Sequence, residues 1–194
     1  MVGSLSLSLL GMCSRDEAAG SFVGEQADAG RDGLAWTAHE GERDTAPFRS
    51  MFAVATDAID RARDVADVAL YVAFRRTIKP LDGVASQERV IGSFPMVRHP
   101  DLAHPESDAH WRDVHGPLAL ASHSAMCDYD QLSIVACLQG PELDGVAMCA
   151  FPDRRTLSER FFDDDAAKAA IIADVSTFAD TRASWPRVVL RQTH

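Results

Sequence analysis

Lysine is nearly missing from this chain, and no long apolar run occurs in it. Only Lys79 and Lys168 stand among 19 basic residues, and 29 acidic residues bring the formal net charge of the 194-residue chain to -10. Nucleic acids and anionic membrane surfaces bind clustered Lys and Arg side chains, so the sequence predicts neither as a partner. The longest nearly uncharged stretch, residues 2–13, is shorter than the roughly 18 residues that a membrane-spanning helix needs.

The motifs that hold common cofactors are also absent. Neither G-x-G-x-x-G nor G-x-x-x-x-G-K-S/T nor G-x-S-x-G occurs, so the sequence predicts no bound cofactor. No basic residue precedes Arg15 and no secretory leader is recognised, which predicts a cytoplasmic protein. Four cysteines without C-x-x-C spacing are expected to be free and buried: Cys13, Cys127, Cys137 and Cys149.

Histidine, in contrast, is concentrated in one stretch. Five of the seven histidines fall within 25 residues: His99, His104, His110, His115 and His123. Their gaps of five, six, five and eight residues differ from the i,i+4 and H-x-H spacings that direct two imidazoles at one ion. We therefore expect no bound metal.

Hydrophobic periodicity predicts the same order of elements in both halves of the chain. In the first half, strands are expected at residues 4–10, 33–39, 48–56 and 70–77, with one helix capped by Ser14 and Glu17 and another by Asp57. In the second half, strands are expected at 89–97, 129–138, 145–151 and 185–192. Its helices are expected from Pro105 to about Gly116 or beyond, at 156–162, and after a cap at Asp165.

This order, strand-helix-strand-strand-helix-strand, is the ferredoxin-like pattern. The sequence therefore predicts an α+β protein built from tandem ferredoxin-like repeats: a degenerate repeat at 1–80, a linker at 81–88 and a second domain at 89–194. Two such sheets in one chain are expected to pack face to face around a cavity. Edge strands of such a barrel are expected to allow a homodimer.

The helix around His110 carries the chemistry. Helical spacing places Trp111, Val114, His115 and Leu118 on one apolar side. His115 on this side is either a core histidine bonded to a backbone carbonyl or a general acid/base in an enclosed pocket. Trp111 is likewise either a core residue or a stacking platform.

Asp108 lies two positions before His110 and has two possible roles. It can pair with Arg112 four residues later, or it can reach toward the pocket side of the helix. Arg112 and Asp113 are expected to form a solvated or interdomain ion pair.

The segment 110–118, His-Trp-Arg-Asp-Val-His-Gly-Pro-Leu, resembles the signature of EthD-domain proteins. The resemblance extends over about residues 89–194 and includes 143–147, Phe161-Phe162-Asp163 and the pattern from Asp174 to Asp180. It implies the dimeric α+β barrel superfamily, in which two ferredoxin-like sheets enclose a small-molecule cavity. The chain departs from the family at Asp108, where a Phe-like residue is usual, and in its first half, which lacks the histidine motif.

The resemblance implies a small, mostly apolar organic ligand rather than one reaction. EthD proteins are associated with bacterial ether degradation beside an oxidation system, and the wider superfamily includes cofactor-free monooxygenases, cyclases, dehydratases, decarboxylases and isomerases. We expect an enzyme performing proton transfer or cofactor-free oxidation, or else a non-catalytic accessory protein for a partner oxygenase. The expected catalytic residues are His115, His110 and Asp108, and the expected ligand contacts are Trp111, Tyr129 and Leu118.

Overall fold

The first half of the chain contributes four strands and two helices. The computed structural model describes residues 6–81 and 89–193. Its first half comprises β1 (Ser6–Cys13), α1 (Ala18–Asp28), β2 (Gly33–Ala38), β3 (Ser50–Val54), α2 (Ile59–Val65) and β4 (Ala69–Lys79). The expected order of elements is therefore correct. β4 runs two residues beyond its expected end, and most of the expected linker lies outside the described residues.

The second half repeats this order with longer helices. It comprises β5 (Val90–Met96), α3 (His104–His110), a π-helical turn (Trp111–His115), α4 (Gly116–Ser122), β6 (Asp128–Gln139), β7 (Gly145–Phe151), α5 (Arg154–Glu159), α6 (Asp165–Phe178) and β8 (Val188–Gln192). The expected hairpin is β6–β7, which pairs Tyr129 with Cys149. The described helices include none that is both long enough and apolar enough to cross a membrane.

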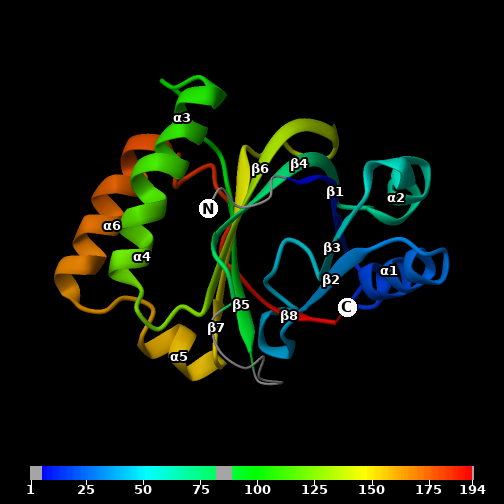
Figure 1. Cartoon of the computed structure of the whole chain (residues 1–194), viewed down its shortest axis with the longest axis horizontal. Helices are drawn as coiled ribbons and strands as arrows, with labels where there is room; N and C mark the ends of the chain where they lie inside the picture. Colours follow the sequence, from blue (N-terminus) through cyan, green and yellow to red (C-terminus); the bar gives the residue numbers. More distant parts are fainter. Residues whose placement is uncertain (1–5, 82–88, 194) are drawn as a thin grey trace.

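The eight strands close into one antiparallel barrel. Their order around it is β1-β3-β2-β8-β5-β7-β6-β4. Each half supplies four adjacent strands, and the pairings β2–β8 and β4–β6 join the halves. Helices α1 and α2 lie on one side of the barrel, and α3, α4 and α6 lie on the other (Figure 1). The predicted α+β architecture of tandem ferredoxin-like repeats is thus confirmed.

The barrel corrects one expectation about assembly. Each of the eight described strands pairs with a neighbour on both sides, so the edge strands expected to support a homodimer are not free. Barrel closure removes such edges by satisfying their backbone groups. The homodimer itself stays a prediction.

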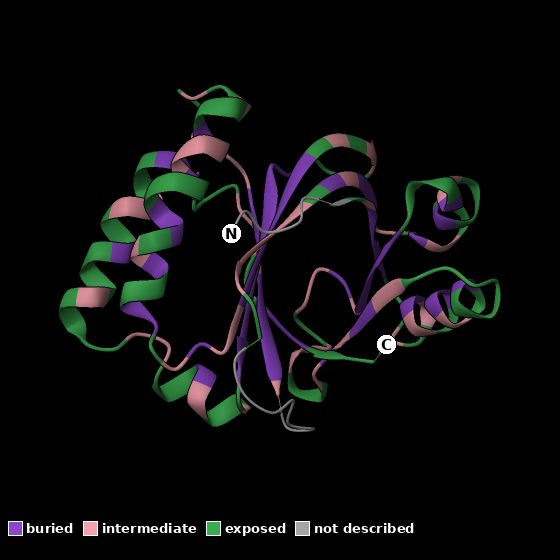
Figure 2. Ribbon diagram, in the orientation of Figure 1, coloured by how far each residue is buried: buried purple, intermediate pink, exposed green. Residues whose placement is uncertain are grey.

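Apolar side chains form separate layers inside and outside the barrel. Leu10, Met51, Leu132 and Leu190 belong to a cluster that draws on both halves and fills the interior. Figure 2 shows that most residues of the central strands are buried. Outside, α1 and α2 pack on the first sheet through one cluster, while α4 and α6 pack on the second through another. Successive strand side chains point to opposite faces, which separates the interior layer from the helix-covered layers.

The helix of the histidine motif is continuous from α3 to α4, with a widened turn in its middle. Pro105 lies in the first turn, as expected, and the helix runs past Gly116 to Ser122. At the π-helical turn the N–H of Gly116 donates to the carbonyl of Trp111, five residues earlier. Pro117 lacks an N–H and would crowd the preceding turn of a regular helix, which favours this widening.

The widened turn changes which side chains are buried. Trp111 is 1% exposed and His115 is 9% exposed, but Val114 is 49% exposed. The prediction that Val114 shares their apolar side is therefore wrong. A π-helical turn has more residues than an α-turn, so His115 lies under Trp111 and Val114 rotates outward.

The predicted helix caps are only partly correct. Ser14 donates its hydroxyl to Asp67 rather than capping α1, whose N-cap, Glu17, makes no side-chain cap bond. Asp57 accepts from Arg31 and does not cap α2. The cap of α6 is the neighbouring Asp164, which accepts from the N–H of Ala167, instead of Asp165.

Gly11 should be essential to the packing of the first sheet. A Cβ at this position would lie 2.1 Å from Cζ of Phe52, which is fully buried and packs edge-on against Phe22. We expect Gly11→Ala to lower the free energy of unfolding by about 1–3 kcal/mol through overpacking.

The matched control is Gly24→Ala in α1, where a Cβ meets nothing within 4 Å. Because alanine favours a helix over glycine, this change should raise stability by about 0.5–1 kcal/mol. Urea denaturation measures both. Equal stability of the two variants would contradict the packing argument.

Candidate functional site

A cavity of about 320 Å³ lies between the helices of the second half and the face of its sheet that they cover. Aromatic and aliphatic side chains form most of its wall: Phe94, Met96, Trp111, Ala119, Phe161, Phe162, Ile171, Val175 and Phe178. The polar groups His115, His123 and Tyr129 also line it. Small-molecule sites commonly combine an apolar wall with a few polar groups.

Asp174 holds two of the motif histidines. Its Oδ2 lies 2.8 Å from Nδ1 of His115, and its Oδ1 lies 2.7 Å from Nε2 of His110. Phe178, one turn further along α6, packs against both imidazoles with ring centroids 5.1 Å apart in each case. Both orientations are thus fixed from α6.

The bond to Asp174 determines which nitrogen of His115 is basic. A carboxylate only accepts hydrogen bonds, so Nδ1 of His115 carries the proton and donates it, leaving the Nε2 lone pair of the neutral ring unprotonated. Burial lowers the pKa of His115, although the hydrogen bond and the charge of Asp174 oppose this shift. His115 is therefore neutral near pH 7 and can accept a proton at Nε2.

Tyr129 presents a hydroxyl to the same cavity. Its oxygen accepts from Nε1 of Trp111 and from Nε2 of Gln131, both at 3.1 Å. Gln131 is held in turn, because its Nε2 also donates to the carbonyl of Trp111 and its Oε1 accepts from Arg76 of β4. The tyrosine oxygen thus receives two N–H bonds, and its own hydrogen stays available to a ligand. Burial raises the pKa of Tyr129, so the hydroxyl keeps that hydrogen.

The predicted site residues separate into two groups. His115, Trp111 and Tyr129 line one cavity, and His110 reaches it indirectly through Asp174. Asp108 binds Arg76 at 2.9 Å and also forms the expected pair with Arg112, at 3.7 Å, and it does not line the cavity. Half-buried Leu118 packs in the layer between helices and sheet.

The expected core-histidine alternative applies to a different residue. His115 bonds a carboxylate, whereas His123 bonds the backbone carbonyl of Phe161. Burial also lowers the pKa of His123. Arg112 pairs with Asp113 at the surface, as expected. Within residues 6–81 and 89–193, no group of three or more metal-ligating side chains comes together.

Asp174 is the site residue that sequence reasoning missed. A signal for it exists, because Asp174 lies three residues after Ile171 and four before Phe178, both buried on α6. A carboxylate on the buried side of a helix needs a partner, and buried carboxylates without one are costly. The five clustered histidines are the candidates for that partner.

The position of the cavity corrects another expectation. The site of His115 was expected between the two sheets, inside the barrel. The helices instead cover the outer face of the second sheet (Figure 1). A histidine on their buried side therefore faces a cavity outside the barrel.

Comparisons with known proteins agree with this architecture. Residues 99–182 match a family model described as EthD domain. An anthrone oxidase-like protein of known structure is 10% identical, with 98% of this chain and 91% of that chain covered and a TM-score of 0.57. A candidate monooxygenase from Fusobacterium nucleatum subsp. nucleatum is 11% identical, with 100% and 94% covered and a TM-score of 0.58. No curated protein matches the chain.

Asp174 should control the pKa of His115. We expect Asp174→Asn to lower that pKa further, because the variant loses the negative charge that favours the protonated imidazole. NMR titration of the histidine ring protons measures the shift. The control Asp165→Asn removes an exposed carboxylate from the first turn of the same helix and should leave the pKa of His115 unchanged. An unchanged pKa in Asp174→Asn would refute the coupling.

Proposed function

We propose that the protein is an enzyme acting on a small aromatic ketone in the His115 cavity, and the match of residues 99–182 to the EthD domain model is one premise of this proposal. The observation that carries the proposal is the 2.8 Å contact between His115 and Asp174 at the wall of an apolar cavity. A buried imidazole held by a carboxylate is a general base whose orientation and tautomer are fixed.

The proposed chemistry begins with proton transfer from carbon. His115 Nε2 takes a proton from a carbon that a nearby carbonyl makes acidic, and the electron pair delocalises onto the carbonyl oxygen. Tyr129 donates its hydroxyl hydrogen to that oxygen, where negative charge develops. The lowered pKa of His115 supports this role, because the basic form is already present at neutral pH.

Anthrone is the substrate that we propose to test. The anthrone oxidase-like protein shares the fold, and anthrone is a flat tricyclic ketone with an acidic methylene group. The cavity, at about 320 Å³, falls within the range of roughly 300–1,000 Å³ typical of small-molecule sites. Trp111 and Phe178 offer aromatic surfaces to its rings.

Oxidation would follow the proton transfer with dioxygen as co-reactant. The electron pair left on the methylene carbon reduces dioxygen, and one oxygen atom stays on that carbon as a carbonyl. The other oxygen atom leaves as water with the two methylene hydrogens. Anthrone and dioxygen thus give anthraquinone and water.

His115→Asn should slow the proton-transfer step. Exchange of the anthrone methylene hydrogens in heavy water, followed by NMR without oxygen, should slow by roughly 100-fold or more. His99→Asn is the matched control, because His99 lies outside the cavity lining. Absorbance of anthraquinone in air then reports oxidation separately. Exchange by the wild-type protein no faster than in buffer would overturn the proposal, and equal rates in His115→Asn would remove His115 from it.

Arg76 should set the direction of the Tyr129 hydrogen bond. Without Arg76, Oε1 of Gln131 loses its donor, and a turned amide would accept the hydroxyl hydrogen that a ketone needs. We expect Arg76→Met to reduce the preference for fluorenone over fluorene by about 2–10-fold, the effect of one neutral hydrogen bond.

Calorimetry measures this preference as the ratio of the dissociation constants of fluorene and fluorenone, two ligands that share the same carbon skeleton. Arg75→Met is the control, because Arg75 is the neighbouring residue of β4 and bonds Asp130 on the opposite face. A ratio that stays at the wild-type value in Arg76→Met would show that Arg76 does not orient the site.

A further inference from the structure

A second cavity of about 400 Å³ opens inside the barrel, on the opposite face of the sheet from the His115 cavity. Strands β2, β4, β5, β6, β7 and β8 contribute to its wall, so both halves of the chain line it. Alternation along β6 separates the two cavities, because Tyr129 faces the helices while Asp128 and Asp130 face the interior.

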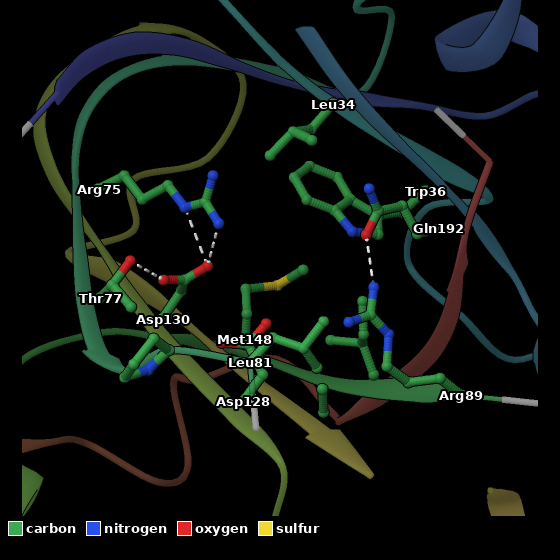
Figure 3. Close-up of a pocket in the computed structure, with 13 residues that line it drawn as sticks. Leu34, Trp36, Arg75, Thr77, Leu81, Arg89, Asp128, Asp130, Met148 and Gln192 are labelled. Atoms are coloured by element: carbon green, nitrogen blue, oxygen red, sulfur yellow. Dashed lines mark hydrogen bonds and ion pairs between the residues drawn. The ribbon is translucent and has the colours of Figure 1, made fainter. Parts of the chain in front are cut away.

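The apolar part of this barrel cavity suits a flat ring. Leu34 and Trp36 lie on one side of the space, and the side chain of Met148 points toward them from the other side (Figure 3). Trp36 is only 5% exposed, so its position is fixed by the core. Aromatic rings pack favourably against an indole and against a thioether.

One ion pair in the barrel cavity is complete without a ligand. Arg75 donates two hydrogen bonds to Oδ2 of Asp130, at 2.9 and 2.6 Å, and Thr77 donates to Oδ1 at 2.6 Å (Figure 3). The charge of Asp130 is therefore balanced, and both of its oxygens are occupied.

Two other charged groups in the cavity are not matched in this way. Arg89 donates to Oε1 of Gln192 at 2.8 Å, and that partner is a neutral amide. Asp128 forms no salt bridge with the described residues, and its carboxyl group receives only a backbone hydrogen bond, from Tyr129. Burial raises the pKa of Asp128 and the nearby charge of Asp130 adds to the shift, while the charges of Arg89 and Arg75 oppose it. A partly buried carboxyl group with a single backbone donor keeps acceptor positions for a ligand hydroxyl.

We propose that the barrel cavity is a second binding site, for a small aromatic hydroxycarboxylate. Its ring would lie between Trp36 and Met148, its carboxylate would accept from Arg89, and its hydroxyl would donate to Asp128. An organic cation fits less well, because the guanidinium group of Arg89, whose hydrogen-bond partner is a neutral amide, lines the space. This site is independent of the proposed function, since the sheet separates it from His115.

Calorimetric titration with four probes tests the proposal: 3-hydroxybenzoate, 4-hydroxybenzoate, benzoate and phenol. The wild-type protein should bind the better hydroxybenzoate more tightly than benzoate or phenol. Arg89→Gln should reduce the preference for hydroxybenzoate over phenol by roughly tenfold or more, the usual effect of a charged hydrogen bond. Asp128→Asn should reduce the preference for hydroxybenzoate over benzoate, because the hydroxyl loses a charged acceptor while benzoate loses a repelling charge.

Ratios between probes separate recognition from folding, because a damaged fold weakens all four probes together. Arg155→Gln is the matched control, because Arg155 is exposed on α5 and lines neither cavity, and it should leave every ratio unchanged. The proposal is overturned if the wild-type protein binds none of the probes at millimolar concentration. It is equally overturned if Arg89→Gln and Asp128→Asn keep the wild-type ratios, or if Arg155→Gln changes them as much as Arg89→Gln does.

Discussion

The antiparallel pairing of β4 with β6 is the constraint on which both cavities depend. It joins the two halves of the barrel, and it pairs Arg75 with Leu132 and Arg76 with Gln131. Because neighbouring side chains of a strand point to opposite faces, Arg75 turns inward to Asp130 while Arg76 turns outward to Gln131 and Asp108. A shift of one residue in this register would exchange the two arginines between the two faces of the sheet. Barrel closure and the electrostatics of both sites are thus one structural requirement.

The order of elements could be predicted because it depends on local patterns. In strands such as β5 and β7, apolar and polar residues alternate or the residues form a short apolar run, and turn residues separate the strands. Hydrophobic periodicity and turn residues are therefore enough to predict the order of elements. Val114 could not be placed, since its exposure depends on a π-helical turn that regular helical spacing does not contain. The prediction of the Ser14 cap was wrong for a related reason. Ser14 is a residue type that caps helices, but Asp67, distant in sequence, offers the Ser14 hydroxyl a stronger, charged acceptor.

The site could be predicted only in part, because its contacts are not local. The buried side of the histidine helix identifies His115 and Trp111, but the carboxylate that orients His115 comes from Asp174, 59 positions later. The location of the cavity follows from the predicted fold itself. In a ferredoxin-like layer the helices cover the sheet face that points away from the barrel interior. A histidine on the inner side of such a helix therefore faces this outer layer, and the intervening sheet separates it from the interior.

The two halves have diverged in a way that a single chain permits and a homodimer does not. A symmetric dimer carries the same residue at both equivalent positions. Here the layer between α1, α2 and the first sheet is filled by alanines, such as Ala19 and Ala62, and by the Phe22–Phe52 pair. The second half places Trp111 and Phe178 at the corresponding layer, where both line the His115 cavity. The first half still contributes to the site through Arg76 of β4, which donates a hydrogen bond to Gln131 of β6, across the junction between the two halves. One half is thus free to serve as support while the other carries the histidines.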